Sequence, residues 1–284
     1  MTRLNNIIGA FEQGRPAFAS FAPADAQSAI EFSTAPYDGV IFEMEHNPFD
    51  ARALGDALQY LLNRKQILSA GSLAPAVTPL ARIPANGVER NQWLAKQALD
   101  RGVYGLVFPH IGDADQADNA IASCRYARPK TAEFHEPIGV RGDGPTACSR
   151  YWGLSQQEYY KKADVWPLNP NGELLAIIQC ESVTGMNNLD DILTRVKGIG
   201  CVLIGEGDLS QDLGFPRDYD HPVIHGALEH IVATCKKHNV PVGHPHVTTK
   251  NVERVIAEGF RFLMSKPVST YAAIDKAKEV LGIT

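Results

Sequence analysis

The chain has 284 residues, 44% hydrophobic residues and a formal net charge of −5, which allow one large domain or two small ones. Because it contains no basic run, nucleic acid is not expected as a partner. No apolar stretch approaches the roughly 18–20 residues that span a membrane, and the N-terminus lacks a signal-peptide core. The five cysteines form no Cys-x-x-Cys pair, which favours reduced thiols and a soluble, cytoplasmic protein.

Strand and helix patterns alternate along the first half of the chain. In chain order, the predicted elements are helix 4–13, strand 17–21, helix 24–33, strand 39–43, helix 51–63, strand 79–83, helix 88–101, strand 104–108 and helix 114–128. The stretch 129–172 then shows little periodicity and is rich in Gly, Pro, Tyr and Trp. We expect it to form a long irregular loop, either functional or mobile.

The alternation resumes after this stretch. The predicted elements are strand 174–180, helix 187–196, strand 201–205, a helix beginning near Leu209, helix 223–238, strand 240–243, helix 251–258, strand 260–264 and helix 271–280. Eight strands alternating with helices predict a single α/β domain over residues 1–284, a (β/α)8 TIM barrel with an N-terminal helix. No Gly-x-Gly-x-x-Gly follows the first strand, which disfavours a dinucleotide-binding sheet.

Two acidic residues, Glu181 and Asp208, each follow an apolar strand, and the two strands are neighbours in this order. In a parallel barrel both would lie at the carboxyl ends of the strands, where ligands bind. Two adjacent carboxylates there suit a hard divalent cation that keeps open positions for substrate. The alternative is a pair of solvated loop acids. Other polar residues expected at this face are Glu43, Glu45, His46, Arg82, His110, Arg141 and His244.

Six motifs, in order over nearly the whole chain, resemble those of the HpcH/HpaI aldolase family. They are Glu43-Met-Glu-His46, Ala81-Arg-Ile-Pro84, Leu99-Asp-Arg-Gly102 with Val107-Phe-Pro109, Gly139-Val-Arg-Gly-Asp-Gly144, Gln179-Cys-Glu181 and Gly205-Glu-Gly-Asp-Leu-Ser210. The resemblance implies a class II pyruvate aldolase, a lyase that cleaves or forms 4-hydroxy-2-oxo acids. It implies a divalent cation (Mg2+, Mn2+ or Co2+) as cofactor, and a 2-oxo acid and an aldehyde as partners. It also implies a homo-oligomer, a hexamer or trimer.

The resemblance assigns four residues to the metal and the oxo acid. Glu181 and Asp208 would be the metal ligands, and Gln179 would line the site. Arg82 would contact the keto or enolate oxygen of pyruvate, where a fixed positive charge meets developing negative charge. A 2-oxo acid can chelate a metal through its carboxylate and keto oxygens, so these assignments agree with the chemistry.

Other residues are assigned to proton transfer and support. His46 would be the acid/base, acting with Glu43 and nearby carboxylates, because histidine titrates near the working pH. Asp100 would support the site across a subunit contact. Gly207 has no side chain, so the backbone N–H groups of residues 207 and 208 could approach the substrate carboxylate.

Three departures from the family pattern concern the same face. Glu43 replaces the usual aspartate and extends its carboxylate by one methylene. Glu206 replaces the usual proline and either strengthens cation binding, repels an anionic acceptor or points to solvent. His244 and His246 have a spacing seen among metal ligands, although a proline separates them, and His244 could instead contact substrate. The aromatic side chains of 129–172 belong to the aldehyde pocket, a subunit interface or the core.

Three alternatives remain open from the sequence. Lys266 follows the eighth strand and could form an imine with a carbonyl substrate, as in a Schiff-base aldolase. The same site could serve a related lyase or decarboxylase acting on another metal-bound oxo acid. A barrel that binds a 2-oxo acid without turnover is the third alternative, although binding alone would not need an acid/base.

Overall fold

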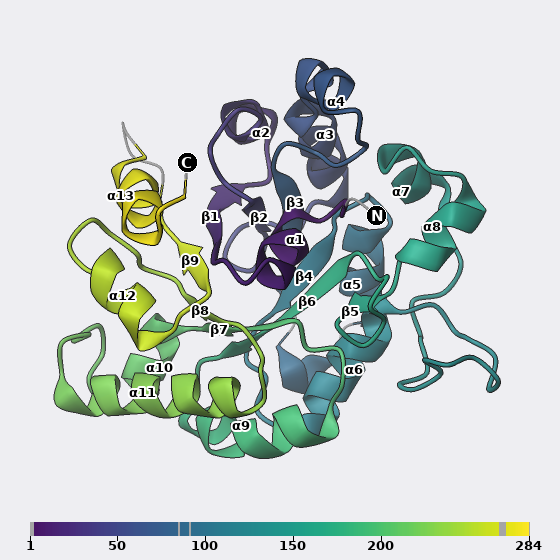
Figure 1. The fold of residues 1–284 in the computed structure, drawn as a ribbon. Coiled ribbons are helices and arrows are strands. Elements are labelled where there is room, and N and C mark those ends of the chain that lie inside the picture. The colour runs from purple at the N-terminus through teal and green to yellow at the C-terminus, as the bar shows by residue number, and fades with distance from the viewer. Residues whose placement is uncertain (1–2, 85, 91, 267–270, 284) are drawn as a thin grey trace.

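The computed structural model describes residues 3–84, 86–90, 92–266 and 271–283. Within them, parallel strands close into a barrel, because β1 pairs with both β2 and β9 and β4 pairs with β6 (Figure 1). The barrel strands are β1 (Ala17–Pro23), β2 (Gly39–Glu43), β3 (Thr78–Arg82), β4 (Gly105–Phe108), β6 (Leu174–Cys180), β7 (Cys201–Ile204), β8 (Val242–His244) and β9 (Phe262–Met264). The short β5 (Val165–Trp166) lies beside β6. The predicted (β/α)8 barrel is confirmed.

Helices surround the strands in Figure 1. They are α1 (Asn6–Glu12), α2 (Ala26–Phe32), α3 (Ala51–Leu61), α4 (Arg64–Ala70), the 3-10 turn η1 (Gly87–Glu89), α5 (Gln92–Leu99), α6 (Ala114–Cys124), α7 (Thr146–Tyr151), α8 (Gln156–Lys162), α9 (Val183–Arg195), α10 (Glu206–Asp212), α11 (Pro222–Lys237), α12 (Val252–Glu258) and α13 (Ala272–Leu281). None in the described ranges is long and apolar enough to cross a membrane.

The N-terminal helix α1 closes the amino end of the barrel. Its Ile7, Ile8 and Phe11 share a buried apolar cluster with side chains from alternate strand positions such as Ile41 and Leu175. Alternate strand positions face the same side, so this cluster fills the barrel interior. The carboxyl end of the barrel is thereby left as the open face.

The stretch 129–172 is more ordered than predicted, because it contains α7, α8 and β5. The ring of Trp152 stacks on that of Tyr104 with centroids 4.1 Å apart, and its Nε1 donates a hydrogen bond to the Gly102 carbonyl at 2.8 Å. Tyr159 is fully buried against the same tryptophan. These aromatics therefore belong to the core, and the expectation of a wholly irregular loop was wrong.

Other element boundaries also differ from the prediction. Helix α4 was not predicted, and the predicted helix 88–101 consists of η1 and α5. Helix α9 begins four residues earlier than predicted, at Val183 instead of 187, because the Ser182 hydroxyl caps it by accepting the Gly185 N–H at 3.0 Å. The capping residue Ser182 thus directly follows Glu181, at the open face.

Candidate active site

Glu43 and Arg82 are register partners at the ends of β2 and β3. Glu43 Oε2 accepts a hydrogen bond from Arg82 Nε at 2.7 Å and a second from Arg82 Nη2. The other carboxylate oxygen, Oε1, accepts the backbone N–H groups of Glu45 at 2.8 Å and His46 at 3.2 Å. Glu43 therefore fixes both the arginine and the loop that carries the two following polar residues.

Arg82 is positioned from several sides. Its guanidinium lies 4.4 Å above the centre of the Phe21 ring, a cation–π contact. Nη1 donates to Gln179 Oε1 at 3.3 Å and lies 2.9 Å from Glu45 Oε2. The arginine thus presents a fixed positive charge to the open face, in the place where the sequence predicted it.

Glu45 carries a buried carboxylate at this face, with 8% of its side chain exposed. Burial raises the pKa of this carboxyl above its ordinary value, while the nearby Arg82 charge acts against the shift. Arg82 Nη1 is close enough for an ion pair, but the geometry gives Glu45 Oε2 no hydrogen bond within the described residues. A buried acceptor without a donor is costly unless a ligand satisfies it.

Glu181 follows β6 and is almost fully buried. Its Oε2 accepts the side-chain N–H of Gln179 at 2.9 Å, and its Oε1 accepts the backbone N–H of His110 at 2.6 Å. Burial raises the pKa of Glu181 from 4.5 to about 7, and the negative charge of Asp208 adds to the effect. Gln179 links Glu181 to Arg82, so the acidic and basic residues form one connected network.

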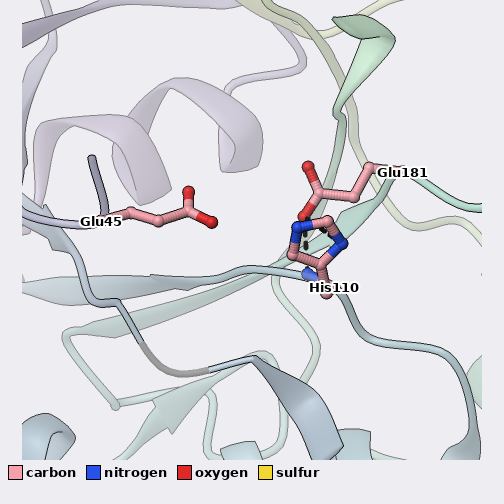
Figure 2. A group of neighbouring side chains, drawn as sticks. All are labelled: Glu45, His110 and Glu181. Atoms are coloured by element: carbon pink, nitrogen blue, oxygen red, sulfur yellow. Dashed lines mark hydrogen bonds and ion pairs between the residues drawn. The ribbon is translucent and has the colours of Figure 1, made fainter. Parts of the chain in front are cut away.

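Glu45, His110 and Glu181 each offer one ligand atom, and these three atoms lie within 4.8 Å of one another. Figure 2 shows the Glu45 carboxylate extending toward the carboxylate of Glu181 and the ring of His110. The backbone of His110 has a φ of 49°, a left-handed conformation that non-glycine residues rarely adopt. Two buried carboxylates and an imidazole fit a divalent cation, and the cation would supply the partner that Glu45 Oε2 lacks.

From the sequence, Glu45 and His110 were expected only as polar residues at strand ends, without an assigned role. Glu45 could have been found from its place between Glu43 and His46, within the family-like motif. His110 offered the weaker signal of a histidine directly after Pro109 at the end of a strand. The His110 ring comes close to Glu181 because the His110 backbone adopts a left-handed conformation. The sequence pattern does not predict this conformation.

His46, Asp208 and Gly207 lie at the rim of this group. The His46 side chain is 69% exposed, and its Nε2 lies 3.7 Å from Glu45 Oε2. Asp208 is exposed in the first turn of α10, and its charge acts on Glu181. It is outside the three-residue group defined by converging ligand atoms in the described chain. The assignment of Glu181 and Asp208 as the metal ligands stays a prediction.

Asp100 lies apart from these residues within one chain. It follows α5 and precedes β4, which places it at the amino end of the barrel. Its Oδ1 accepts hydrogen bonds from Arg141 Nη2 at 2.9 Å and Nε at 3.2 Å. Arg141 is buried and also donates to the Tyr159 hydroxyl at 2.9 Å, so its role here is to hold the 139–144 loop. A role for Asp100 in a neighbouring subunit stays a prediction.

Two of the three departures from the family pattern, Glu206 and the pair His244 and His246, contact each other. Glu206 is buried, and its Oε2 lies 2.8 Å from Nδ1 of His246. His244 is buried too, and desolvation lowers its pKa from 6.5 to about 4. The His244 Nδ1 accepts the backbone N–H of His246 at 3.1 Å, so it is already engaged. The two histidines belong to no converging metal-ligand group in the described residues.

The comparison with family models decides the classification. Residues 18–265 match the model of the HpcH/HpaI aldolase/citrate lyase family. The chain belongs to this family. Its motif-based identification is therefore confirmed, and so is the prediction of an aldolase-type carbon–carbon lyase.

Individual similar proteins are consistent with this family assignment. The chain is 30% identical over 231 residues to a 2-keto-3-deoxy-L-rhamnonate aldolase of Klebsiella pneumoniae, covering 81% of this chain and 74% of the relative. It is 26% identical over 263 residues to a hydroxypyruvate/pyruvate aldolase of Paraburkholderia phytofirmans, covering 92% and 91%. A crystal structure of a family protein from Burkholderia cenocepacia J2315 superposes with a TM-score of 0.76 at 26% identity, covering 98% of both chains.

Proposed function

We propose that the protein reversibly cleaves a 4-hydroxy-2-oxo acid into an aldehyde and pyruvate, or a close 2-oxo acid. One observation supports this most strongly. Arg82 and Glu181 are linked through the side chain of Gln179 at the open end of the barrel, which brings a fixed positive charge next to a buried carboxylate. A site that must bind a 2-oxo acid and stabilise its enolate needs this combination of charges.

We assign the divalent cation, Mg2+, Mn2+ or Co2+, to Glu181 and Asp208. Glu45 and His110 lie close enough to Glu181 to complete or replace this set. The cation would polarise the keto oxygen of the substrate and stabilise the negative charge that develops when the C3–C4 bond breaks.

In this proposal, protein residues bind and orient the substrate. Arg82 contacts the keto oxygen, and its orientation is fixed by Glu43 before substrate arrives. Gln179 lines the site, and the backbone N–H groups of Gly207 and Asp208 receive the substrate carboxylate. A β-carbon added to Gly207 would meet only the Tyr219 hydroxyl, 3.9 Å away, so this stretch of backbone is open to a ligand.

His46 removes the proton of the C4 hydroxyl group in cleavage and returns it in addition. Its exposed ring lies at the rim beside Glu45, so it can reach a substrate atom that extends outward from the buried carboxylates. We also propose that the chain forms a homo-oligomer in which Asp100 supports the site of a neighbouring subunit. The Arg141 ion pair orients Asp100 for that contact.

The proposal is tested by measuring pyruvate release from 4-hydroxy-2-oxo acids before and after complete metal removal. Activity should disappear with chelator and return when Mg2+, Mn2+ or Co2+ is added. Activity that survives complete metal removal would contradict the proposal. A borohydride trap with pyruvate checks the Lys266 alternative, and the protein mass should stay unchanged because no imine forms.

A further inference from the structure

His110 lies beside the buried carboxylate of Glu181, and the roles proposed above give it no defined task. It follows Pro109 at the carboxyl end of β4. Glu181 Oε1 accepts the backbone N–H of His110 at 2.6 Å, and Nδ1 of the His110 ring lies 3.6 Å from the same oxygen. Because β4 pairs with β6, the strand that Glu181 follows, the barrel itself holds the ring and the carboxylate side by side.

The ring of His110 is accessible to a ligand. Its side chain is 36% exposed at the open face of the barrel. The hydrogen bond that fixes this residue comes from its backbone, and neither ring nitrogen forms a hydrogen bond within the described parts of the chain. The described residues therefore leave the ligand capacity of this imidazole unused, although the ring lies against a buried carboxylate.

Glu45 supplies an independent sign of a ligand at this position. Only 8% of its side chain is exposed. Its Oε2 accepts no hydrogen bond from the described residues, although Arg82 Nη1 lies 2.9 Å away. Figure 2 shows this carboxylate extending toward the Glu181 carboxylate and the His110 ring. A buried carboxylate oxygen without a partner is costly, and a cation bound between these side chains would satisfy it.

The three side chains are spaced for one ion. Glu45, His110 and Glu181 each bring a ligand atom to within 4.8 Å of the other two. Nitrogen and oxygen ligands lie about 2.1 Å from a divalent transition-metal ion, so two ligands of the same ion are about 3 to 4.2 Å apart. Small side-chain rotations bring the three atoms into this range, and no described hydrogen bond restrains the ring of His110.

An imidazole ligand changes which ion such a site prefers. Carboxylate and water oxygens suit Mg2+, which keeps several of its waters and requires nearly ideal octahedral geometry. Imidazole nitrogen suits the later transition-metal ions, and the affinity of a given site rises from Mn2+ to Co2+. Glu181 and Asp208, the ligands assigned above, offer oxygen atoms alone. A nitrogen from His110 therefore shifts the preference away from Mg2+ and toward Co2+.

We propose that His110 is a nitrogen ligand of the divalent cation, beside the carboxylates of Glu181 and Glu45, and that it makes the site prefer Co2+ to Mg2+. The inference rests on the proposed function, because the same cation would bind the 2-oxo acid. It adds a nitrogen to the oxygen ligands assigned above and gives Glu45 Oε2 its partner. Three protein ligands leave positions on the ion for the substrate.

Electron spin-echo spectroscopy of the Mn2+-loaded protein tests the ligand directly, because it detects 14N nuclei bonded to the ion. The unaltered protein should show 14N coupling, and labelling its histidines with 15N should remove that coupling without any substitution. The coupling should also vanish in His110→Asn, which removes the imidazole but keeps a residue that adopts a left-handed backbone readily. It should persist in His46→Asn, the variant of the histidine whose ring lies beside Glu45.

Calorimetric titration with Co2+ and with Mg2+ measures the preference. The His110→Asn substitution should weaken Co2+ binding at least about tenfold, since changing even a residue that only supports a ligand has an effect of this size. Mg2+ binding should change by less than about threefold, because this ion prefers oxygen ligands. His230→Asn, the same substitution on the exposed face of α11, is the matched control and should leave both affinities unchanged.

The outcomes separate this inference from the proposed function. Absence of 14N coupling in the unaltered protein, coupling that persists in His110→Asn, or an unchanged ratio of Co2+ to Mg2+ affinity in that variant would overturn the inference. Metal-dependent release of pyruvate alongside any of these results would leave the aldolase function standing. Coupling that depends on His110, in a protein that cleaves no 4-hydroxy-2-oxo acid, would contradict the aldolase function alone.

Discussion

The carboxylate of Glu43 receives Arg82 Nε at 2.7 Å across the register pair that ends β2 and β3. Its second oxygen accepts the backbone N–H groups of Glu45 and His46. One side chain thus links the expected substrate-binding arginine to the loop of the expected acid/base. Both oxygens of the Glu43 carboxylate are therefore engaged, one by the arginine and the other by the backbone of the loop.

Replacing Glu43 should therefore affect catalysis more than stability. Glu43→Gln keeps the shape but removes the charged partner of Arg82, so we expect kcat/KM for a 4-hydroxy-2-oxo acid to fall by about 10- to 100-fold. Steady-state kinetics and thermal unfolding check this together. Glu31→Gln, on the exposed face of α2, is the control. Kinetics of Glu43→Gln within twofold of the unaltered protein would show that this positioning is not needed.

The raised pKa of Glu181 predicts a pH effect on stability in the presence of chelator. Its folded pKa is about 7 against an ordinary value of 4.5. A carboxyl group with a raised folded pKa contributes stability below its unfolded pKa and loses that contribution as pH rises through the folded pKa. The stability of the metal-free protein should therefore fall between about pH 4.5 and 7, by at most about 3 kcal/mol from this residue.

Glu181→Gln isolates this effect because the amide does not titrate in that range. The free energy of unfolding, measured in urea at pH 5 and pH 8 with chelator, should change less with pH in the variant than in the unaltered protein. Identical pH dependence of the two proteins would show that the Glu181 carboxyl titrates normally.

Gly205 is predicted to be indispensable for the geometry of Glu181. A β-carbon at this position would lie 2.1 Å from Glu181 Oε2 and 2.3 Å from its Cβ, which no side-chain rotation alone can relieve. Gly205→Ala should lower activity by about 100-fold, the effect of misplacing a reacting group by roughly 1 Å. The control is Gly226→Ala in α11, where an added β-carbon meets nothing within 4 Å. Equal activity of the two variants would contradict this account.

Trp152 should be a major contributor to stability although it lies outside the regular barrel elements. It is fully buried, stacks on Tyr104 and donates to the Gly102 carbonyl. Trp152→Ala should lower the free energy of unfolding by about 3–5 kcal/mol. Trp93→Ala, at a side chain with 53% exposure, should cost far less. Chemical denaturation of both variants checks this, and equal losses would show that α7 is not part of the core.

The barrel could be predicted because its strands are short apolar runs in regular alternation with helices. The hydrophobic pattern of each element is local, so it can be read directly from the sequence. Glu43, Arg82, Gln179 and Glu181 could be placed at the open end for the same reason. The packing of Trp152 on Tyr104 could not, because it joins residues far apart in the chain. The arrangement of Glu45, His110 and Glu181 depends on the left-handed turn at His110, for which the sequence carries no glycine signal.

The contact between Glu206 and His246 was also not predicted from the sequence. Glu206 follows β7 and His246 follows β8, and because these two strands pair directly, both residues lie at neighbouring strand ends. The sequence allowed Glu206 to strengthen cation binding, repel an anionic acceptor or point to solvent, and it allowed the two histidines to bind a metal or His244 to contact substrate. The structure buries Glu206 and places its Oε2 2.8 Å from His246 Nδ1, so the solvent-facing alternative was wrong.

The most direct test of the account is deuterium exchange at the pyruvate methyl group in D2O, followed by NMR with Mg2+ or Mn2+, then with EDTA, and then in Glu181→Ala. The account predicts exchange that requires the metal, stops with EDTA and is absent from the variant, because the enolate forms only at the Glu181 site. Exchange that continues with EDTA or in Glu181→Ala, or no exchange with metal present, would contradict it.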